Sequence, residues 1–321
     1  MRAAVLREFG GPTALRVDEA PLPEPGPGQV RLRIRASAMN NSDLQMSEGR
    51  YGRPPLPRIL GQEAAGVVDA VGDGVTALGP GMRVVGHVWE SWAEYGVAPE
   101  RELVPLPEEI SFEAAATLPV AYYTAIVALV TTARLRADEW VLINPGSGGV
   151  GVAAVQLAKL LGARVVATTS NDEKRQMLRD LGADVILNWA TDNVASEVLK
   201  LTDGAGLPVA LDGGGTVTFA QCLGGIANAG RIVVYGYTTG MEAVLPIGRL
   251  LTRNVTVAGI AIWNNPGYWE AVEFFRDRVL PAVADGRLTA VVDAVLPLDQ
   301  AGDGLQRLAD RRISGKVVVV P

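Results

Sequence analysis

The chain has 321 residues, of which 48% are hydrophobic and 20% charged, and its formal net charge is −6. An acidic chain of this kind is not expected to bind nucleic acid or an anionic membrane surface, and no apolar run reaches the ~18 residues that a membrane span needs. The length predicts two domains, and the single cysteine, Cys222, rules out an internal disulfide. Met1 to Leu6 have the pattern of a strand and lack the charged, apolar and cleavage regions of a signal peptide, so we expect a cytoplasmic protein.

The first third of the chain reads as short strands separated by glycine and proline. Apolar positions alternate with arginines over residues 30–36, which is the two-residue period of a half-buried strand. A proline-rich loop, Pro21 to Gly28, precedes this strand. Further strands are predicted at 64–71, 83–87 and 93–98. Many short strands at this spacing favour a small barrel or sandwich.

Near Phe112 the pattern changes to alternating strands and helices. Helical periodicity leads through Tyr123 into strands predicted at 141–144, 164–168, 185–187, 209–211 and 231–235. The second intervening helix is predicted to start from a Ser170 cap and to contain Lys174. Such alternation predicts a doubly wound parallel sheet with its ligand at the strand C-termini. A strand at 255–260, an amphipathic helix over 269–284 and strands near Val291 and Val317 are predicted to follow.

A glycine-rich turn joins the first of these strands to its helix. The turn consists of Gly146, Ser147, Gly148, Gly149, Val150 and Gly151. In a strand–turn–helix setting, Gly146 permits the tight turn, Gly148 lets the backbone approach a pyrophosphate, and Gly151 lets the helix pack closely. The helix N-terminus adds unpaired N–H groups and a partial positive charge. The turn therefore predicts a dinucleotide-binding domain.

Three stretches carry a resemblance to a known superfamily. They are Asn40-Asn41-Ser42-Asp43, the run from Gly61 to Val68, and the glycine turn continuing into Val155-Gln156-Leu157-Ala158. With them the whole chain resembles the medium-chain dehydrogenase/reductases, most of all the zinc-free quinone oxidoreductase and enoyl reductase branch. The resemblance implies an α/β protein with two domains and an active site in the cleft. A GroES-like β-rich catalytic domain would span residues 1–115, completed by 262–321, and a Rossmann NADPH-binding domain would span 116–261.

The zinc alcohol dehydrogenases of this superfamily carry an early cysteine ligand and a histidine in a Gly-His-Glu motif. This chain has Asn40 near the first position and Gln62 at the second, and Cys222 lies in the nucleotide domain. A catalytic zinc needs about three N, S or O ligands. His87 is expected to be a packed or strand-end histidine. We therefore expect no metal.

The end of the second nucleotide-domain strand indicates which nicotinamide is bound. An NAD site usually has an acidic residue about 20 positions beyond the glycine turn, whereas this strand ends in Thr169 and Ser170. Their hydroxyls would donate to a 2′-phosphate, and Lys174 would supply charge, with Arg175 as a second cation. The resembling enzymes place an aromatic residue on the following loop, where this chain has Trp189. The alternative is a solvated helix face in which neighbouring acids neutralise Lys174, but NADPH is favoured over NADH.

Other predicted cofactor contacts follow from the resemblance and from the strand ends. Thr124 lies where the family has a threonine near the nicotinamide. Asp212 and Gly213 follow the fourth strand, and Gly236 and Tyr237 follow the fifth. The alternatives are that Asp212 caps the strand end and that the glycines turn the chain.

The run from Asn40 to Asp43 and the run from Gly49 to Gly52 closely resemble the mitochondrial-type 2-enoyl thioester reductases. In those enzymes the tyrosine at the Tyr51 position is the proton donor. Hydride addition at Cβ leaves an enolate that needs a proton at Cα, and Asn40 would hold either the carbonyl oxygen or the nicotinamide amide. The alternative for Tyr51 is packing on the loop Pro54 to Pro57. The arginines nearby, Arg50, Arg53 and Arg58, would attract the phosphates of a thioester carrier or simply form a solvated loop.

Together these features predict a zinc-independent, NADPH-dependent oxidoreductase. It would transfer hydride to a quinone or to the C=C bond of an α,β-unsaturated carbonyl or enoyl thioester, and the sequence leaves the two open. The alternative is a non-catalytic NADPH-binding protein, like the zeta-crystallins of the lens. The apolar edge strand at 255–260 would be an aggregation liability unless it is paired, which predicts a homodimer.

Overall fold

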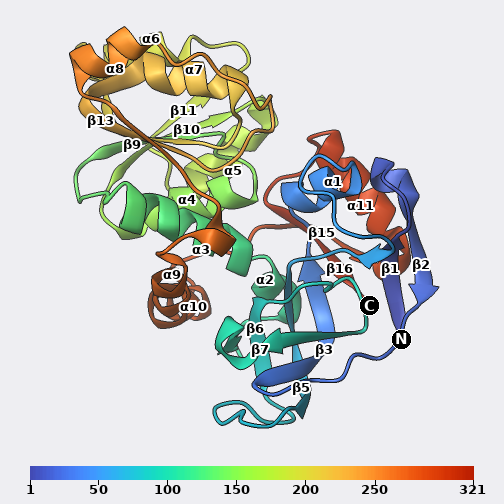
Figure 1. The fold of residues 1–321 in the computed structure, drawn as a ribbon. Coiled ribbons are helices and arrows are strands. Elements are labelled where there is room, and N and C mark those ends of the chain that lie inside the picture. Colours follow the sequence, from blue (N-terminus) through green and yellow to red (C-terminus); the bar gives the residue numbers. More distant parts are fainter. The chain divides into compact units, whose positions relative to one another are not determined.

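The computed structural model describes residues 1–321, which divide into two compact units. Unit 1 comprises residues 1–120 and 276–321, and unit 2 comprises residues 121–275. The sequence places the corresponding boundaries near 115 and 261. Each unit has its own sheets (Figure 1). No helix is both long and apolar enough to cross a bilayer.

Unit 1 is built mainly from antiparallel strands, with a few short helices. Its strands are β1 (Arg2–Leu6), β2 (Leu15–Glu19), β3 (Gln29–Ala38), β4 (Arg58–Ile59), β5 (Glu63–Val71), β6 (Arg83–His87), β7 (Tyr95–Pro99), β8 (Leu103–Pro105), β15 (Val292–Pro297) and β16 (Lys316–Val320). Its helices are α1 (Asn41–Ser47), α2 (Phe112–Ala116), α10 (Leu280–Ala284) and α11 (Ala301–Ala309). Helix α3 (Pro119–Ile126) crosses into unit 2.

Strand β3 organises the larger sheet of unit 1, whose order is β15-β16-β3-β5-β6-β8, with β7 also paired to β3. Val30, Leu32 and Ile34 are buried on β3, whereas Arg33 and Arg35 are exposed, as the alternation predicts. The C-terminal strand β16 pairs antiparallel with β3, so the last residues of the chain complete the N-terminal sheet. A smaller sheet has the order β2-β1-β4.

Unit 2 alternates strands and helices. Its strands are β9 (Trp140–Asn144), β10 (Arg164–Thr169), β11 (Val185–Asn188), β12 (Leu207–Asp212), β13 (Ile226–Val234) and β14 (Thr256–Gly259). Its helices are α4 (Gly149–Leu160), α5 (Arg175–Asp180), α6 (Val194–Leu201), α7 (Thr216–Gly225), α8 (Ile247–Arg253) and α9 (Tyr268–Phe274). A π-helical segment, Val127–Thr132, continues α3.

The six strands of unit 2 form one parallel sheet with the order β11-β10-β9-β12-β13-β14. Numbered within the sheet this is 3-2-1-4-5-6, the Rossmann order, so the predicted α/β doubly wound fold is confirmed. The strand order reverses between β9 and β12, and Asn144 pairs with Asp212 at their C-terminal ends. Ligands of such sheets bind outside this switch point.

Local details differ from the sequence predictions. The Ser170 cap is wrong: Ser170 is exposed, and the side chain of Asn171 accepts from the Glu173 backbone N–H at the start of a 3₁₀ turn, Asp172–Lys174. Lys174 therefore precedes α5. The helix predicted over 269–284 is divided into α9, a π-helical segment over Phe275–Val279, and α10.

Candidate cofactor and catalytic sites

The glycine turn follows β9 and leads directly into α4. Gly146 donates its N–H to the Thr168 carbonyl at 2.7 Å, which ties the turn to the adjacent strand β10. A Cβ on Gly151 would lie 2.5 Å from the Pro145 carbonyl oxygen and 2.6 Å from Gly146 backbone atoms. Backbone atoms cannot move aside as a flexible side chain can, so only glycine fits at 151.

Gly148 differs from these two positions and meets the requirement for a phosphate-binding turn. It is the N-cap of α4 with φ −85°, and a Cβ there would meet nothing within 4 Å. The space beside it is therefore open at the N-terminus of a 12-residue helix. Such an end presents backbone donors and a partial positive charge to an anion. The residues present thus fit a dinucleotide pyrophosphate.

The ends of β9 and β10 are joined by buried hydrogen bonds. Ser147 Oγ lies 3.3 Å from Thr169 Oγ1, and Thr168 Oγ1 donates to Asn144 Oδ1 at 2.6 Å. Asn144 Nδ2 donates to Gln221 Oε1 at 3.0 Å, and Gln221 Nε2 donates to the Trp189 carbonyl at 2.7 Å. No motif in the sequence points to this chain of contacts. It connects Asn144, the last residue of β9, to the loop that carries Trp189.

Ser170 and Lys174 lie on the connection after β10, at the C-terminal edge of the sheet. Ser170 is exposed and Lys174 half-buried, and no acidic side chain ends β10. Trp189 is half-buried, packs against the core of unit 2, and donates its backbone N–H to Thr169 at 2.9 Å. The fold therefore brings the segments of Thr169 and Trp189 together.

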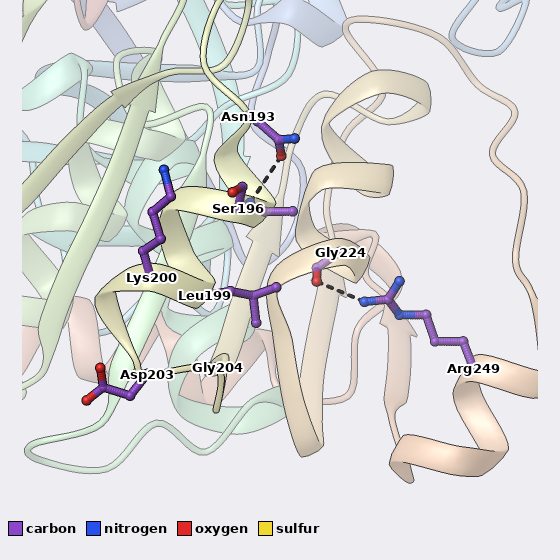
Figure 2. A pocket seen from close by; sticks show the side chains of 9 residues that line it. Asn193, Ser196, Leu199, Lys200, Asp203, Gly204, Gly224 and Arg249 are labelled. Carbon is purple, nitrogen blue, oxygen red and sulfur yellow. Dashed lines mark hydrogen bonds between the residues drawn. The ribbon is translucent and has the colours of Figure 1, made fainter.

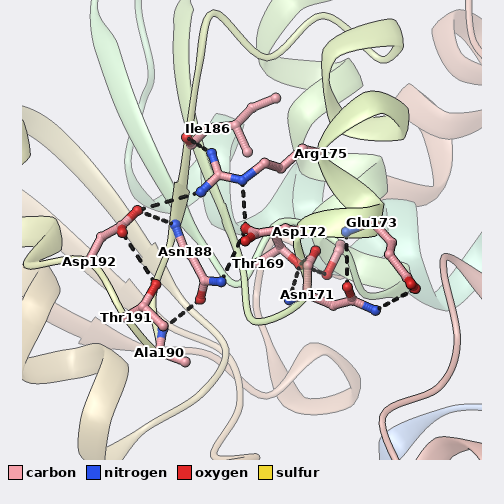
Figure 3. A network of polar contacts seen from close by, with 11 residues as sticks. Thr169, Asn171, Asp172, Glu173, Arg175, Ile186, Asn188, Ala190, Thr191 and Asp192 are labelled. Carbon is pink, nitrogen blue, oxygen red and sulfur yellow. Dashed lines mark hydrogen bonds and ion pairs between the residues drawn. The ribbon is translucent and has the colours of Figure 1, made fainter.

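Arg175 is held inside a separate polar network (Figure 3). Its guanidinium donates to Asp172 Oδ1 at 2.7 Å and to the Ile186 carbonyl at 2.8 Å, and lies 3.7 Å from Asp192 Oδ2. Asn188 also donates to Asp172, at 3.2 Å. These contacts lower the pKa of Asp172, first through the Arg175 hydrogen bond. Arg175 thus anchors the β10–β11 connection.

Asp212 ends β12 and is fully buried. Its carboxylate accepts from the backbone N–H groups of Gly214 and Gly215 at 3.2 and 3.3 Å, and from the Thr218 hydroxyl. Burial raises the pKa of Asp212 to about 6. These contacts correspond to the strand-end cap that was the alternative to direct cofactor binding.

The remaining predicted cofactor residues are placed as follows. Gly213 and Gly236 lie close together after β12 and β13, because a Cβ on Gly236 would lie 2.7 Å from the Gly213 oxygen. Tyr237, beside them in the chain, is half-buried, and Thr124 is buried within α3. Gly149 and Val150 form the first turn of α4. Their contact with a cofactor stays a prediction.

Asn40 belongs to a buried polar network in unit 1. Its Nδ2 donates to Glu63 Oε1 at 2.8 Å, and its Oδ1 accepts from Lys316 Nζ at 2.7 Å. Lys316 also forms an ion pair with Glu63, with side chains that are 4% and 0% exposed. Glu63 Oε2 accepts the Val120 backbone N–H at 2.9 Å. Asn40 itself is half-buried at the junction of β3 and α1.

Asp43 and Gln62 form the other half of this network. Asp43 Oδ2 accepts the Asn40 backbone N–H at 2.8 Å, and Oδ1 accepts from Gln62 Nε2 at 2.8 Å. Gln62 also donates to Ser42 Oγ at 2.7 Å. Burial raises the pKa of Asp43 to about 6. The side chains at the positions where the resemblance places zinc ligands are thus hydrogen-bonded within the chain.

Tyr51 follows α1 and packs against the core of unit 1. It is half-buried beside a cluster that includes Leu44, Met46 and Leu60. The neighbouring arginines have partners of their own: Arg50 pairs with Glu48, the Arg53 guanidinium lies 5.1 Å from the Phe9 ring centre, and that of Arg58 lies 5.9 Å from the Trp89 ring centre. These pairings weaken the prediction that the arginines attract phosphates.

One hollow of about 760 Å³ lies on unit 2 along α6 (Figure 2). It is lined by α6 residues with Gly224 and Arg249, and Arg249 donates to the Gly224 carbonyl at 2.8 Å. None of the predicted site residues lines it. It is therefore distinct from the switch point of the sheet.

Comparisons with known proteins decide the family. The chain matches the family model for the alcohol dehydrogenase GroES-like domain over residues 26–108, and that for zinc-binding dehydrogenases over residues 149–277. The quinone oxidoreductase of Pseudomonas aeruginosa is 33% identical over 316 residues, covering 98% of this chain and 97% of that protein. The chain belongs to the zinc-free quinone oxidoreductase branch of the medium-chain dehydrogenase/reductases.

Solved structures of this superfamily share the whole fold. Escherichia coli quinone oxidoreductase complexed with NADPH superposes with a TM-score of 0.94 at 26% identity, covering 100% of both chains. The structure of an NAD-dependent alcohol dehydrogenase gives 0.90 at 36% identity, also covering 100% of both. Like its relatives in this branch, the chain is an oxidoreductase with a GroES-like unit and a Rossmann unit, as its sequence predicts.

Proposed function

We propose that this protein is an NADPH-dependent reductase that transfers hydride to a quinone or to the C=C bond of an α,β-unsaturated carbonyl or enoyl thioester. The observation that carries the proposal is the open N-terminus of α4 at Gly148, at the switch point of the Rossmann sheet. The Pseudomonas aeruginosa relative, which spans nearly the whole chain, is a quinone oxidoreductase.

The choice of NADPH over NADH rests on the end of β10. Thr169 and Ser170 stand where an NAD site usually has an acid, and Lys174 follows on the same connection. A carboxylate there would repel the 2′-phosphate, whereas the exposed Ser170 hydroxyl and an ammonium donate to it. Thr169 is fully buried, and its hydroxyl donates to the Asn171 carbonyl at 3.1 Å. The E. coli relative is complexed with NADPH, although the similar alcohol dehydrogenase is NAD-dependent. Direct titration with both nucleotides settles the choice.

We assign the chemistry on the acceptor to Asn40 and Tyr51. Bound NADPH supplies the hydride. Asn40 donates an amide N–H to the acceptor oxygen, which gains negative charge as the hydride arrives. The Tyr51 phenol donates a proton, to Cα of an enolate or to the oxygen of a reduced quinone. Since Arg50, Arg53 and Arg58 have partners within unit 1, acceptors without phosphate groups are favoured.

The deciding experiment is anaerobic NADPH oxidation with a panel of acceptors. The panel contains 1,4-naphthoquinone, an enone, trans-2-hexenal and crotonyl-CoA, and NADH is the control. Turnover confined to the quinone would identify the protein as a quinone reductase, and a preference for crotonyl-CoA would identify it as an enoyl thioester reductase. Tight NADPH binding without turnover on any acceptor would support the non-catalytic, crystallin-like alternative instead.

Replacement of Tyr51 by phenylalanine tests the proton donor. The substitution removes one hydroxyl and keeps the packing against the Leu44 and Met46 cluster. We expect the kcat for an enone to fall by about 10²-fold, the range of general acid catalysis, with the Kd for NADPH unchanged. Equal turnover by the Y51F variant and the wild type would remove Tyr51 from the mechanism.

We also propose that the protein forms a homodimer through β14. This strand ends the sheet of unit 2, and the segment before it exposes Met241, Val244, Ile247 and Leu251. An unpaired edge beside exposed apolar side chains is a liability that pairing with a second copy removes. Light scattering at ~10 μM should give twice the chain mass, and V244E/L251E should give the monomer mass. A monomeric wild type would overturn this proposal.

A further inference from the structure

The register of β16 on β3 brings Lys316 to Asn40. Val318 pairs with Ala38 in this antiparallel ladder, so two residues further the first residue of β16 lies opposite Asn40. Lys316 Nζ is 2.7 Å from Asn40 Oδ1 and forms an ion pair with Glu63. Glu63 in turn accepts from Asn40 Nδ2 at 2.8 Å. The three side chains therefore close a ring of hydrogen bonds.

This ring fixes which way the Asn40 amide points. An ammonium group only donates hydrogen bonds, and an ionised carboxylate only accepts them. The amide oxygen must therefore face Lys316, and the amide nitrogen must face Glu63. In the flipped amide, the N–H groups would face the ammonium, which is also a donor, and the oxygen would face the carboxylate, which is also an acceptor. Glu63 Oε1 accepts a hydrogen bond from one of the two Nδ2 hydrogens. The other Nδ2 hydrogen is available for a hydrogen bond to a bound molecule.

Stability alone gives little reason for this ion pair. Burying two charges carries a desolvation cost that their attraction roughly offsets, and well-packed apolar residues often serve as well or better. Here both side chains are almost fully buried, and the Glu63 carboxylate bonds within the ring and to the Val120 backbone N–H. An orienting role accounts for the pair where a stabilising role does not.

We propose that Lys316 and Glu63 are positioning residues that hold Asn40 as a hydrogen-bond donor to the oxygen of the acceptor. The inference rests on the proposed function and decides between the two roles open to Asn40, since a donor suits a carbonyl oxygen. The ammonium of Lys316 also polarises the amide, because hydrogen bonds in a chain strengthen one another. Negative charge on the acceptor oxygen is thereby stabilised through Asn40.

Two uncharged variants of Lys316 isolate the orienting hydrogen bond. Lys316→Gln and Lys316→Met both leave Glu63 without its counter-ion, but only glutamine retains an N–H that can donate to Asn40 Oδ1. Loss of a preorganised donor costs about 10²-fold or more in kcat, so we expect about this loss for Asn40→Ala and about 10-fold for Lys316→Met. Lys316→Gln should recover most of the Lys316→Met loss, and the Kd for NADPH should stay unchanged in all three.

A double-mutant cycle then distinguishes positioning from a structural role. In the Asn40→Ala background, Lys316→Met should cause no further loss of kcat, because the residue it orients is absent. An equal loss of kcat in both backgrounds would overturn the proposal, as would equal kcat values for Lys316→Met and Lys316→Gln. If Lys316→Met does not fold, Lys316→Met/Glu63→Gln removes both charges, and the same cycle is run from that variant.

A readout without turnover separates this proposal from the proposed function. The side-chain amide of Asn40, assigned by its loss in Asn40→Asp, should show a downfield-shifted resonance for the Nδ2 hydrogen bonded to Glu63 in the wild type. In Lys316→Met, where the amide is no longer held in one orientation, this resonance should move toward the shift of an unbonded side-chain amide. The same downfield shift in both proteins would overturn the positioning role even in an active enzyme. A wild type that reduces no acceptor but shows this difference would refute the function and leave the positioning role standing.

Discussion

The glycine turn and the Asn40 network solve the problem of holding a functional group in opposite ways. The turn is local: six consecutive residues place backbone N–H groups at the start of α4. Its glycines matter because they lack a side chain, which leaves room for the close backbone approach at Gly151 and for open space beside Gly148. The network is non-local, since Asn40 and Lys316 are 276 positions apart and meet only through strand pairing. The first site is therefore specified by sterics, and the second by charges and hydrogen bonds.

This difference predicts which substitutions or conditions disrupt each site. A site specified by sterics should tolerate a change of charge nearby but not an added methyl group where backbone atoms touch. A site specified by buried polar groups should tolerate small changes of shape but respond to pH and to the loss of a donor. Substitutions matched within each region test this contrast.

The largest effect is expected at Gly151. A Cβ at this position would lie 2.5 Å from the Pro145 oxygen, so Gly151→Ala must displace the backbone of the turn. Overpacking of this kind costs about 3 kcal/mol, which denaturant unfolding of unit 2 measures. Gly148→Ala is the control: its Cβ meets nothing and its φ of −85° suits any residue, so stability should be kept.

The control also has its own effect on binding. The alanine methyl group at 148 would occupy the open space beside the α4 N-terminus, so the affinity for NADPH should fall by about 10-fold, or 1.4 kcal/mol. Equal stability losses in Gly151→Ala and Gly148→Ala would show that the close backbone approach at 151 does not matter. Unchanged NADPH affinity in Gly148→Ala would place the pyrophosphate elsewhere.

An effect of similar size, but dependent on pH, is expected at Asp43. Burial raises its pKa from 3.8 to about 6, so the folded protein keeps this proton to higher pH than the unfolded chain does. The contribution of Asp43 to stability is therefore most favourable below pH 4 and falls as pH rises to about 6. A shift of about two units corresponds to about 3 kcal/mol. Asp43→Asn should lose this dependence.

The measurement is urea unfolding of wild type and Asp43→Asn at several values between pH 4 and 7. The difference in unfolding free energy should change in favour of the variant as pH rises, whatever its value at pH 4. A constant difference across this range would mean that Asp43 titrates as an exposed carboxyl group does. Asp212 titrates in the same window in both proteins, so it cancels from the comparison.

The same contrast explains what the sequence could predict. The Rossmann strands and the glycine turn are readable because their signals lie within about 30 consecutive residues. Helix α1 carried a local signal that was missed, Asn40 followed by Asp43 at the spacing of a capping box. Helix α11 buries Ala301, Gly304, Leu305 and Leu308, a helical spacing that was also readable.

Other features had no local signal. Lys316 is one residue among several in a C-terminal strand, and only the β16–β3 register shows that it meets Asn40. Likewise, Asn144, Gln221 and the Trp189 backbone are joined only once β9 and the segments around it are folded. The replacement of the Ser170 cap by Asn171 is a shift of one residue, decided by which side chain reaches the Glu173 N–H.

The smallest effect is expected at Lys174, and its neighbour provides the control. A charge-assisted hydrogen bond to the 2′-phosphate is worth about 1.4 kcal/mol or more, so Lys174→Ala should weaken NADPH about 10-fold and leave NADH unchanged. Arg175 is already bound to Asp172, Asp192 and the Ile186 carbonyl. Arg175→Ala should therefore lower stability and keep the ratio of the two nucleotide affinities.

Fluorescence titration of each variant with NADPH and NADH gives this ratio directly. A change of ratio in Arg175→Ala as large as that in Lys174→Ala would mean that the Asp172 network itself shapes the 2′-phosphate site. Nucleotide selectivity would then depend on a network of polar contacts, as the orientation of Asn40 does, and not on a single cation beside β10. The contrast between the two regions would hold for the pyrophosphate turn but not for the rest of the cofactor site.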